Sequence, residues 1–189
     1  MKHKIKLFKS FIIAGTMIVI SPANASFEGY YDVSNWQTAI TPGSDASIDL
    51  NNAPNSITLI GGDNAIDPEE LFATIDFTIS ADATGMLSFN WSYETTDESA
   101  EWDPLSFLHN GTEYALSADG GSLTQSGVFE FNVQLGDVFG FRQASLDSLF
   151  GRAQSTISNF SAPVPLPGAL VLFGIALASL NVFRRNRAE

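Results

Sequence analysis

The central part of the chain alternates apolar and polar residues with a period of two. Successive side chains of a strand point to opposite faces, so this alternation predicts strands with one buried and one solvent-exposed face. Such strands are typical of antiparallel sheets that pack face to face in a sandwich. The clearest stretches are residues 71–79, 87–93 and 129–135.

Weaker alternation predicts further strands between these three. A two-residue hairpin is predicted at Asn110-Gly111, because both central positions of a type I′ turn need positive φ. With about ten strands in one domain, the chain is predicted to be all-β, an antiparallel jelly-roll-like β-sandwich. The weaker strands are predicted at residues 27–31, 47–50, 56–60, 105–109, 112–116, 138–142 and 152–160.

The first 25 residues have the pattern of a secretory signal peptide. Four lysines precede an apolar stretch at residues 11–20, and Ala23-Asn24-Ala25 follows with the small-x-small pattern that signal peptidase reads at Ala23 and Ala25. About ten apolar residues are too few to span a bilayer comfortably. We therefore expect export of the chain and cleavage after Ala25.

The other end of the chain is apolar and then basic. Residues 168–183 carry no charge, and Arg184, Arg185 and Arg187 follow at once. As a helix this stretch would reach about 24 Å, slightly less than a hydrocarbon core of about 30 Å. Because arginines next to a membrane span stay in the cytoplasm, the tail is predicted to be a weak transmembrane anchor.

The tail resembles a known sorting signal. The motif Val164-Pro165-Leu166-Pro167, the apolar stretch and the terminal arginines are similar to the PEP-CTERM family. Leu166 stands where many members have Glu, and Asn186 interrupts the arginines. The resemblance covers about 25 residues. It implies recognition by an exosortase, a membrane protease or transpeptidase that removes the tail.

This resemblance also implies a route and a domain organisation. The chain would cross the inner membrane, stay anchored transiently by its C-terminal helix, and then reach the outer surface or the extracellular matrix. The predicted parts are a signal peptide at residues 1–25, a β-sandwich at 26–162 and a sorting tail at 163–189.

Residues 85–160 resemble a recurrent domain of exported PEP-CTERM proteins. The similar segments are "GMLSFNWSYETTD", "DPLSFLHNGT", "QSGVFEFNVQLGDVFGF" and "GRAQSTISNFSAP". That domain has no established biochemical activity, so the resemblance implies only a fold and an exported setting.

The predicted sandwich is strongly acidic. Between residues 26 and 163 there are two arginines, no lysine and twenty Asp and Glu, a formal charge of about −18. A domain with this charge repels nucleic acid, so we expect no nucleic-acid partner. The chain has no cysteine, and a domain without disulfides depends on its apolar core.

The residue inventory leaves little room for catalysis. His109 is the only histidine after the signal peptide, and it lies beside the predicted hairpin turn. The chain has no cysteine, and no lysine follows the signal peptide. Nucleophilic, zinc and Schiff-base sites therefore have almost no candidate residues. Glycoside hydrolysis needs only two carboxyl groups facing each other across a cleft, so it stays as an alternative to our expectation of no enzymatic activity.

Two acidic segments could bind calcium. Calcium takes six to eight oxygen ligands from carboxylates, amides and carbonyls on a turning loop, although neither segment has the EF-hand spacing. Solvated loops without a metal are the alternative. The candidate ligands are Asp97, Glu98, Glu101 and Asp103 in one segment, and Asp63 and Asp67 in the other.

Trp102 lies inside the first acidic segment and is our candidate platform for a sugar ring, because flat aromatic rings pack on the apolar faces of pyranoses. A tryptophan folded under its own loop is the alternative. Three function classes follow. We favour a non-catalytic surface or matrix protein. The alternatives are a module that binds extracellular polysaccharide with a calcium-supported loop, and a small glycoside-active enzyme.

Overall fold

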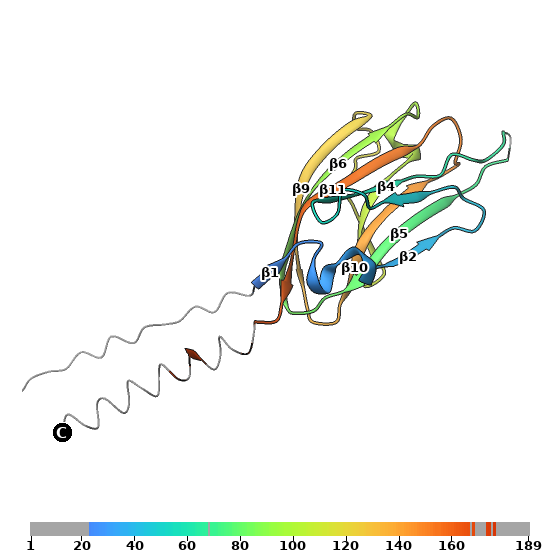
Figure 1. Cartoon of the computed structure of the whole chain (residues 1–189). Helices are drawn as coiled ribbons and strands as arrows, with labels where there is room; N and C mark the ends of the chain where they lie inside the picture. The colour runs from blue at the N-terminus through green and yellow to red at the C-terminus, as the bar shows by residue number, and fades with distance from the viewer. Residues whose placement is uncertain (1–22, 68, 167, 169–172, 175, 177–189) are drawn as a thin grey trace, which may run out of the picture.

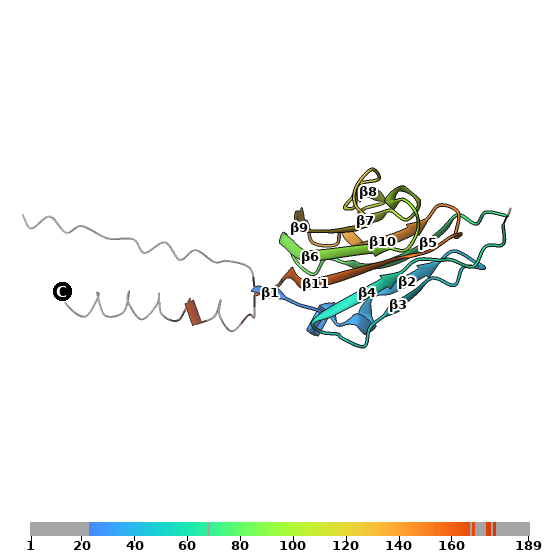
Figure 2. The same cartoon turned by 90° about the horizontal axis from the view of Figure 1, so that it is seen from above.

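The computed structural model describes residues 23–67, 69–166, 168, 173, 174 and 176. In this part the chain forms two antiparallel sheets that face each other (Figures 1 and 2). One sheet has the order β3-β4-β11-β6-β9, with β1 beside β11, and the other has the order β2-β5-β10-β7-β8. The predicted all-β sandwich of antiparallel sheets is thereby confirmed.

The first sheet contains β1 (Ala23–Ala25), β3 (Ser47–Asp49), β4 (Ser56–Ile60), β6 (Gly85–Thr95), β9 (Thr124–Val133) and β11 (Ala153–Val164). The second contains β2 (Gln37–Ile40), β5 (Ala73–Ser80), β7 (Leu105–His109), β8 (Thr112–Ala115) and β10 (Val138–Ser145). Three short 3-10 turns, η1 (Gly29–Tyr31), η2 (Val33–Asn35) and η3 (Ala100–Trp102), connect them.

The strongest alternating stretches became the strands that carry the core. Burial alternates residue by residue along β5, and its inward side chains are at most 6% exposed. The predicted hairpin is confirmed between β7 and β8, where Asn110 and Gly111 have φ of 49° and 80°. These positive angles are the reason why Asn-Gly suits a two-residue turn.

Near the N-terminus one predicted strand was wrong and one strand was missed. Residues 27–31 do not form a strand, because Gly29 has a φ of 61° and turns the chain into η1. β2 was missed because all four of its residues are exposed, so it shows no alternation. At the other end β11 extends to Val164, two residues past the predicted domain boundary.

Aromatic rings fill the space between the sheets. Trp36, which follows η2, stacks on Phe77 of β5 at 4.8 Å and on Phe141 of β10 at 5.8 Å between ring centroids. Its indole nitrogen donates a hydrogen bond of 3.0 Å to the carbonyl oxygen of Tyr31. Each such ring pair contributes about 0.5–1.5 kcal/mol beyond its buried area.

Tyr31 joins three distant segments at one end of the sandwich. Its side chain is fully buried, and its hydroxyl donates to the carbonyl oxygen of Pro163 at 2.8 Å. The same hydroxyl accepts the backbone N–H of Asp82 at 3.0 Å. Burial raises the pKa of Tyr31, so the hydroxyl keeps its proton. The η1–η2 segment is therefore fixed against β11 and the loop after β5.

Most of the predicted targeting segments lie outside the described residues. These are residues 1–22 of the signal peptide, Pro167, Arg184, Arg185, Arg187 and most of the apolar stretch 168–183. Within the described part, no helix is long and apolar enough to cross a membrane. Ala23 and Ala25 pair with the end of β11 at Val164 and Ala162.

Replacing Tyr31 by Phe should lower the free energy of unfolding by about 1–3 kcal/mol, because a buried carbonyl and an N–H lose their partner. Denaturant titration measures this effect. The control is Tyr30→Phe, which changes an exposed neighbour and should stay within about 0.5 kcal/mol of the unmodified protein. Equal effects of the two variants would contradict the role of the Tyr31 hydroxyl.

Candidate functional site

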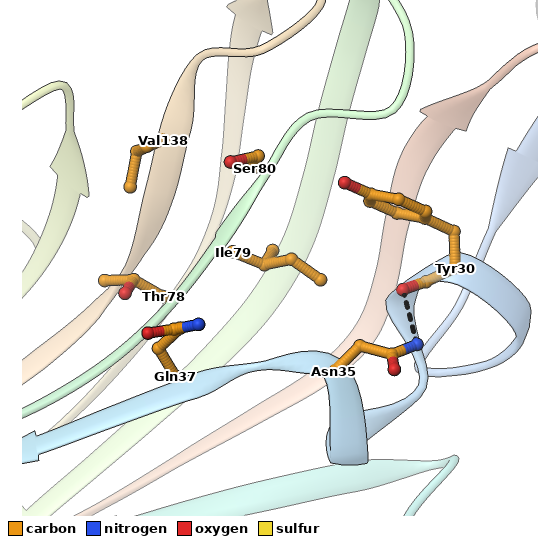
Figure 3. Close-up of a pocket in the computed structure, with 7 residues that line it drawn as sticks. All are labelled: Tyr30, Asn35, Gln37, Thr78, Ile79, Ser80 and Val138. Carbon is orange, nitrogen blue, oxygen red and sulfur yellow. Dashed lines mark hydrogen bonds between the residues drawn. The ribbon is translucent and has the colours of Figure 1, made fainter.

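An open groove lies where the edge strand β2 begins. β2 pairs with β5 only as far as Gln37 opposite Thr78, so Ile79 and Ser80 of β5 have no β2 residue beside them. The η1–η2 segment forms the facing wall, and the groove has a volume of about 590 Å³ (Figure 3). We call it the Tyr30 groove. It is lined by Tyr30, Asn35, Gln37, Thr78, Ile79, Ser80 and Val138.

Tyr30 supplies the exposed aromatic surface of this groove. Its side chain is 42% exposed, and its ring stands edge-on against the buried ring of Tyr31, with centroids 5.2 Å apart and an angle of 85°. Tyr31 is itself fixed by the hydrogen bonds of its hydroxyl. The Tyr30 ring therefore rests on the core through this edge-on contact.

The turn that carries Tyr30 is held by local hydrogen bonds. The side-chain amide of Asn35 donates to the carbonyl oxygens of Tyr30 at 3.0 Å and Gly29 at 3.3 Å (Figure 3). The carboxylate of Asp32 accepts from the N–H of Ser34 at 2.9 Å and from its hydroxyl at 2.7 Å. These bonds lower the pKa of Asp32, so its carboxylate stays ionised.

The chemistry of the Tyr30 groove is uncharged and polar. Gln37 provides an amide, and Thr78 and Ser80 provide hydroxyl groups. Amides and hydroxyls can both donate and accept hydrogen bonds. A flat ring with such groups around it is the composition that recognises polyhydroxylated ligands.

An ion network lies beside the groove on the same face of the sheet. Arg142 of β10 is opposite Asp76 of β5, two residues along each strand from the pair of Gly140 and Thr78. Its guanidinium donates to both carboxylate oxygens of Asp76 at 2.7 Å and to Glu113 of β8 at 3.1 Å. Hydrogen bonds and charge from Asp76 raise the pKa of Arg142.

A second groove, of about 470 Å³, lies on the outer face of the first sheet. Its lining is polar, and its one aromatic residue, Tyr93, is only 2% exposed. It contains a single carboxylate, and the Tyr30 groove contains none. Neither groove therefore presents the two facing carboxyl groups of a glycosidase. The second groove is lined by Ser92, Tyr93, Glu94, Thr124, Gln125, Ser126, Gln154 and Thr156.

The predicted calcium ligands do not come together as one set. Glu98, Glu101 and Asp67 are exposed. Asp63 accepts the N–H of Gly151 at 3.1 Å and lies 3.9 Å from the Nε of Arg152. Among the described residues, no group of three or more acidic, histidine or cysteine side chains could hold a metal ion. Calcium binding stays a prediction, and it would need backbone oxygens for most of its ligands.

Two of those residues are buried within electrostatic range of a third carboxylate that the sequence did not indicate. Asp97 and Asp103 are 3% and 0% exposed, and Asp147, from the loop after β10, is 8% exposed. Each of the first two carboxylates is repelled by Asp147. Asp147 was missed because it lies far along the chain and has no acidic neighbours in sequence. We call these three residues the buried carboxylate cluster.

Asp103 is the most deeply buried member of the cluster. Its Oδ2 accepts the hydroxyl of Thr95 at 2.6 Å, whereas its Oδ1 is buried without a hydrogen-bond partner among the described residues. The nearby hydroxyl of Ser145 favours the ionised form but does not have the geometry of a hydrogen bond to Oδ1. Loss of solvation dominates, and it raises the pKa of Asp103 to about 6.

His109 has a structural role. Its Nε2 lies 2.9 Å from Oδ2 of Asp137, which also accepts the N–H of Gln134 at 2.8 Å. Asn110 donates to the other oxygen of Asp137 at 2.9 Å. These bonds lower the pKa of Asp137 to about 2 and tie the β7–β8 turn to the β9–β10 turn. In the described part, the polar contacts of the imidazole are with Asp137 and Asn110, and none is with a hydroxyl nucleophile.

Trp102 ends η3 and is half-buried. Its carbonyl oxygen accepts the N–H of Leu146 at 2.7 Å, and its side chain lines neither groove. Its role as a sugar platform stays a prediction. Tyr30 was missed because residues 27–31 were interpreted as a strand. The turn-forming order of Gly29, two tyrosines and Asp32 was the signal that could have found it.

Comparison with known proteins gives similar folds and no family. No protein-family model matches the sequence, and no curated protein matches it. A family 11 carbohydrate-binding module from Clostridium thermocellum in complex with a beta-1,3-1,4-mixed-linked tetrasaccharide is similar over 78% of this chain and 99% of its own. Its sequence identity is 10% and its TM-score 0.42.

Two other solved structures are also similar. TmCBM61, in complex with beta-1,4-galactotriose, is 9% identical over 74% of this chain and 97% of its own, with a TM-score of 0.42. A family 35 carbohydrate-binding module from Clostridium thermocellum is 13% identical over 73% and 98%, with a TM-score of 0.33. At these TM-scores, any function has to be argued from the geometry of this chain.

The buried carboxylate cluster predicts an unusual dependence of stability on pH. The pKa of Asp103 is about 6 in the fold and about 3.9 in an unfolded chain. The native state therefore binds more protons between these values, and stability falls as the pH rises through them. The full difference corresponds to about 3 kcal/mol. Between pH 5 and pH 7.5 about half of this difference, ~1.4 kcal/mol, is expected, and melting temperatures at these two values measure it.

Asp103→Asn should stabilise the domain at pH 7.5 and remove most of this dependence. Glu130→Gln is the matched control, because it removes one exposed charge of the first sheet and should leave the slope with pH unchanged. Equal slopes for Asp103→Asn and the unmodified protein would contradict the prediction.

Calcium added to the same series, with magnesium as the comparison, tests whether the cluster binds calcium more strongly than magnesium.

Proposed function

We propose that this protein is an exported, non-catalytic module that binds polysaccharide through the Tyr30 groove. One observation carries the proposal: an exposed tyrosine ring, fixed edge-on by the core, faces amide and hydroxyl groups across an open groove. An open groove on a sheet edge accommodates the interior of a long chain as well as its end, which suits a polymer.

Rigidity of the groove supports this proposal. A protein that binds a flexible sugar chain loses affinity when its own side chains must be ordered on binding. Here Tyr30 rests on the buried Tyr31, and Asn35 is bonded to the backbone of the same turn. A ring that is already ordered offers its apolar face at little entropic cost.

We further propose that the tail sorts the protein through an exosortase, and that the protein ends at the outer surface or in the extracellular matrix. The Val-Pro-Leu-Pro motif supports this, and its first residue, Val164, ends β11 beside the groove-forming segment. In this proposal the anchor holds the groove close to the membrane until the tail is removed. A purely structural matrix protein, without a glycan ligand, is the second candidate.

Binding should depend on Tyr30. Replacing Tyr30 by Ala should weaken binding to a retained polysaccharide by about tenfold, the equivalent of 1.4 kcal/mol, because the apolar platform is lost. Affinity electrophoresis through gels that contain single polysaccharides, followed by titration calorimetry, measures the change. The protein starts at Ser26 in these experiments.

The control for this experiment is Phe72→Ala. Phe72 is 58% exposed and precedes β5 at its other end, about 20 Å from Thr78, the nearest lining residue of β5. This variant should bind as the unmodified protein does. Equal losses in both variants, or no retention of any polysaccharide, would leave the structural matrix role as the better description.

The sorting proposal has its own test. In a host that carries the matching exosortase, the released protein should lack Arg184, Arg185 and Arg187, whereas a host without it should keep them in the membrane fraction. Intact-mass measurement of released and membrane-bound protein distinguishes the two. A released form that ends at Glu189 in the matching host would overturn this proposal.

A further inference from the structure

We infer that the polysaccharide accepted by the Tyr30 groove is uncharged. The inference rests on the proposed function and adds a ligand class to it. Three observations carry it: the lining of the groove, the pairing of both arginines in the described part, and the carboxylates that lie next to lining residues in the chain.

The lining offers no positive charge that could compensate the charge of an anion. All seven lining side chains are uncharged. The side-chain amide of Asn35 already donates to two carbonyl oxygens, so Gln37 is the main remaining amide donor. A carboxylate or sulfate group only accepts hydrogen bonds, whereas a sugar hydroxyl both donates and accepts. The mixed groups of this groove therefore fit hydroxyls.

Both arginines of the described residues are already engaged by carboxylates. Arg142 forms a bidentate pair with Asp76 and a further bond to Glu113. Arg152 lies 2.8 Å from Asp45 and 3.9 Å from Asp63. The described part of the chain contains no other Arg or Lys. Recognition of a uronate or sulfate would have to take an arginine away from two partners.

Three carboxylates lie close to the lining residues in the chain. Glu28 and Asp32 are exposed on either side of η1, which carries Tyr30, and Asp82 follows β5 where its N–H meets the hydroxyl of Tyr31. Repulsion between exposed charges extends over about 8 Å at physiological ionic strength, so charges this near to Tyr30 in the chain disfavour an anionic ligand. The formal charge of about −18 on the sandwich adds to this repulsion.

Polysaccharides that share a backbone and carry neutral or charged substituents test the inference. Suitable pairs are hydroxyethylcellulose with carboxymethylcellulose, dextran with dextran sulfate, and fully methyl-esterified with unesterified polygalacturonate. For any pair of which one polysaccharide binds the protein, the neutral member should bind at least about tenfold more tightly than the charged member. Its affinity should stay constant between about 0.05 and about 1 M NaCl, because no ion pair is involved.

Glu28→Lys separates charge exclusion from a poor steric fit. Glu28 is exposed and lies two residues before Tyr30 in the chain, so this variant should bind the charged member more tightly and leave the neutral member unchanged. Equal or tighter binding of a charged member by the unmodified protein would overturn the inference while leaving the proposed function intact. If no pair and no other polysaccharide is retained, or if Tyr30→Ala binds normally, the proposed function itself is overturned.

Discussion

The hydroxyl of Tyr31 is the contact on which the groove depends. It donates to the carbonyl oxygen of Pro163 in the last strand and accepts the N–H of Asp82 after β5. The η1–η2 segment precedes the first ladder of the second sheet, so strand pairing does not hold it. Because Tyr31 is fixed, Tyr30 has a firm surface to rest on. Packing and two hydrogen bonds thus replace the ladder at this corner.

The aromatic core explains how a domain without a disulfide keeps this corner rigid. Trp36 stacks on Phe77 and Phe141 and also contacts Phe139 and Phe160, so one side chain binds both sheets to the N-terminal segment. A fixed ring loses little freedom when a ligand arrives. The stability of the core and the preorganisation of the groove therefore have the same origin.

The buried carboxylate cluster, in contrast to the aromatic core, destabilises the fold. Loss of solvation makes an ionised carboxylate costly inside a protein, and Asp97, Asp103 and Asp147 have no arginine or lysine among the contacts described for them. The cost falls when Asp103 holds a proton, which is the physical meaning of its raised pKa. A fold can tolerate such a destabilising group when the rest of its core is stable.

The sequence by itself determined the strand pattern, the Asn110-Gly111 hairpin and the surplus of carboxylates, because each of these depends on neighbouring residues or on composition alone. Only the tertiary structure placed Trp36 in the core, Tyr30 over the groove and Asp147 within electrostatic range of Asp103. β2 is an exposed edge strand and leaves no alternation to read. The groove combines η1, β2, β5 and β10, and contacts between segments so far apart in the chain arise only when the two sheets pack.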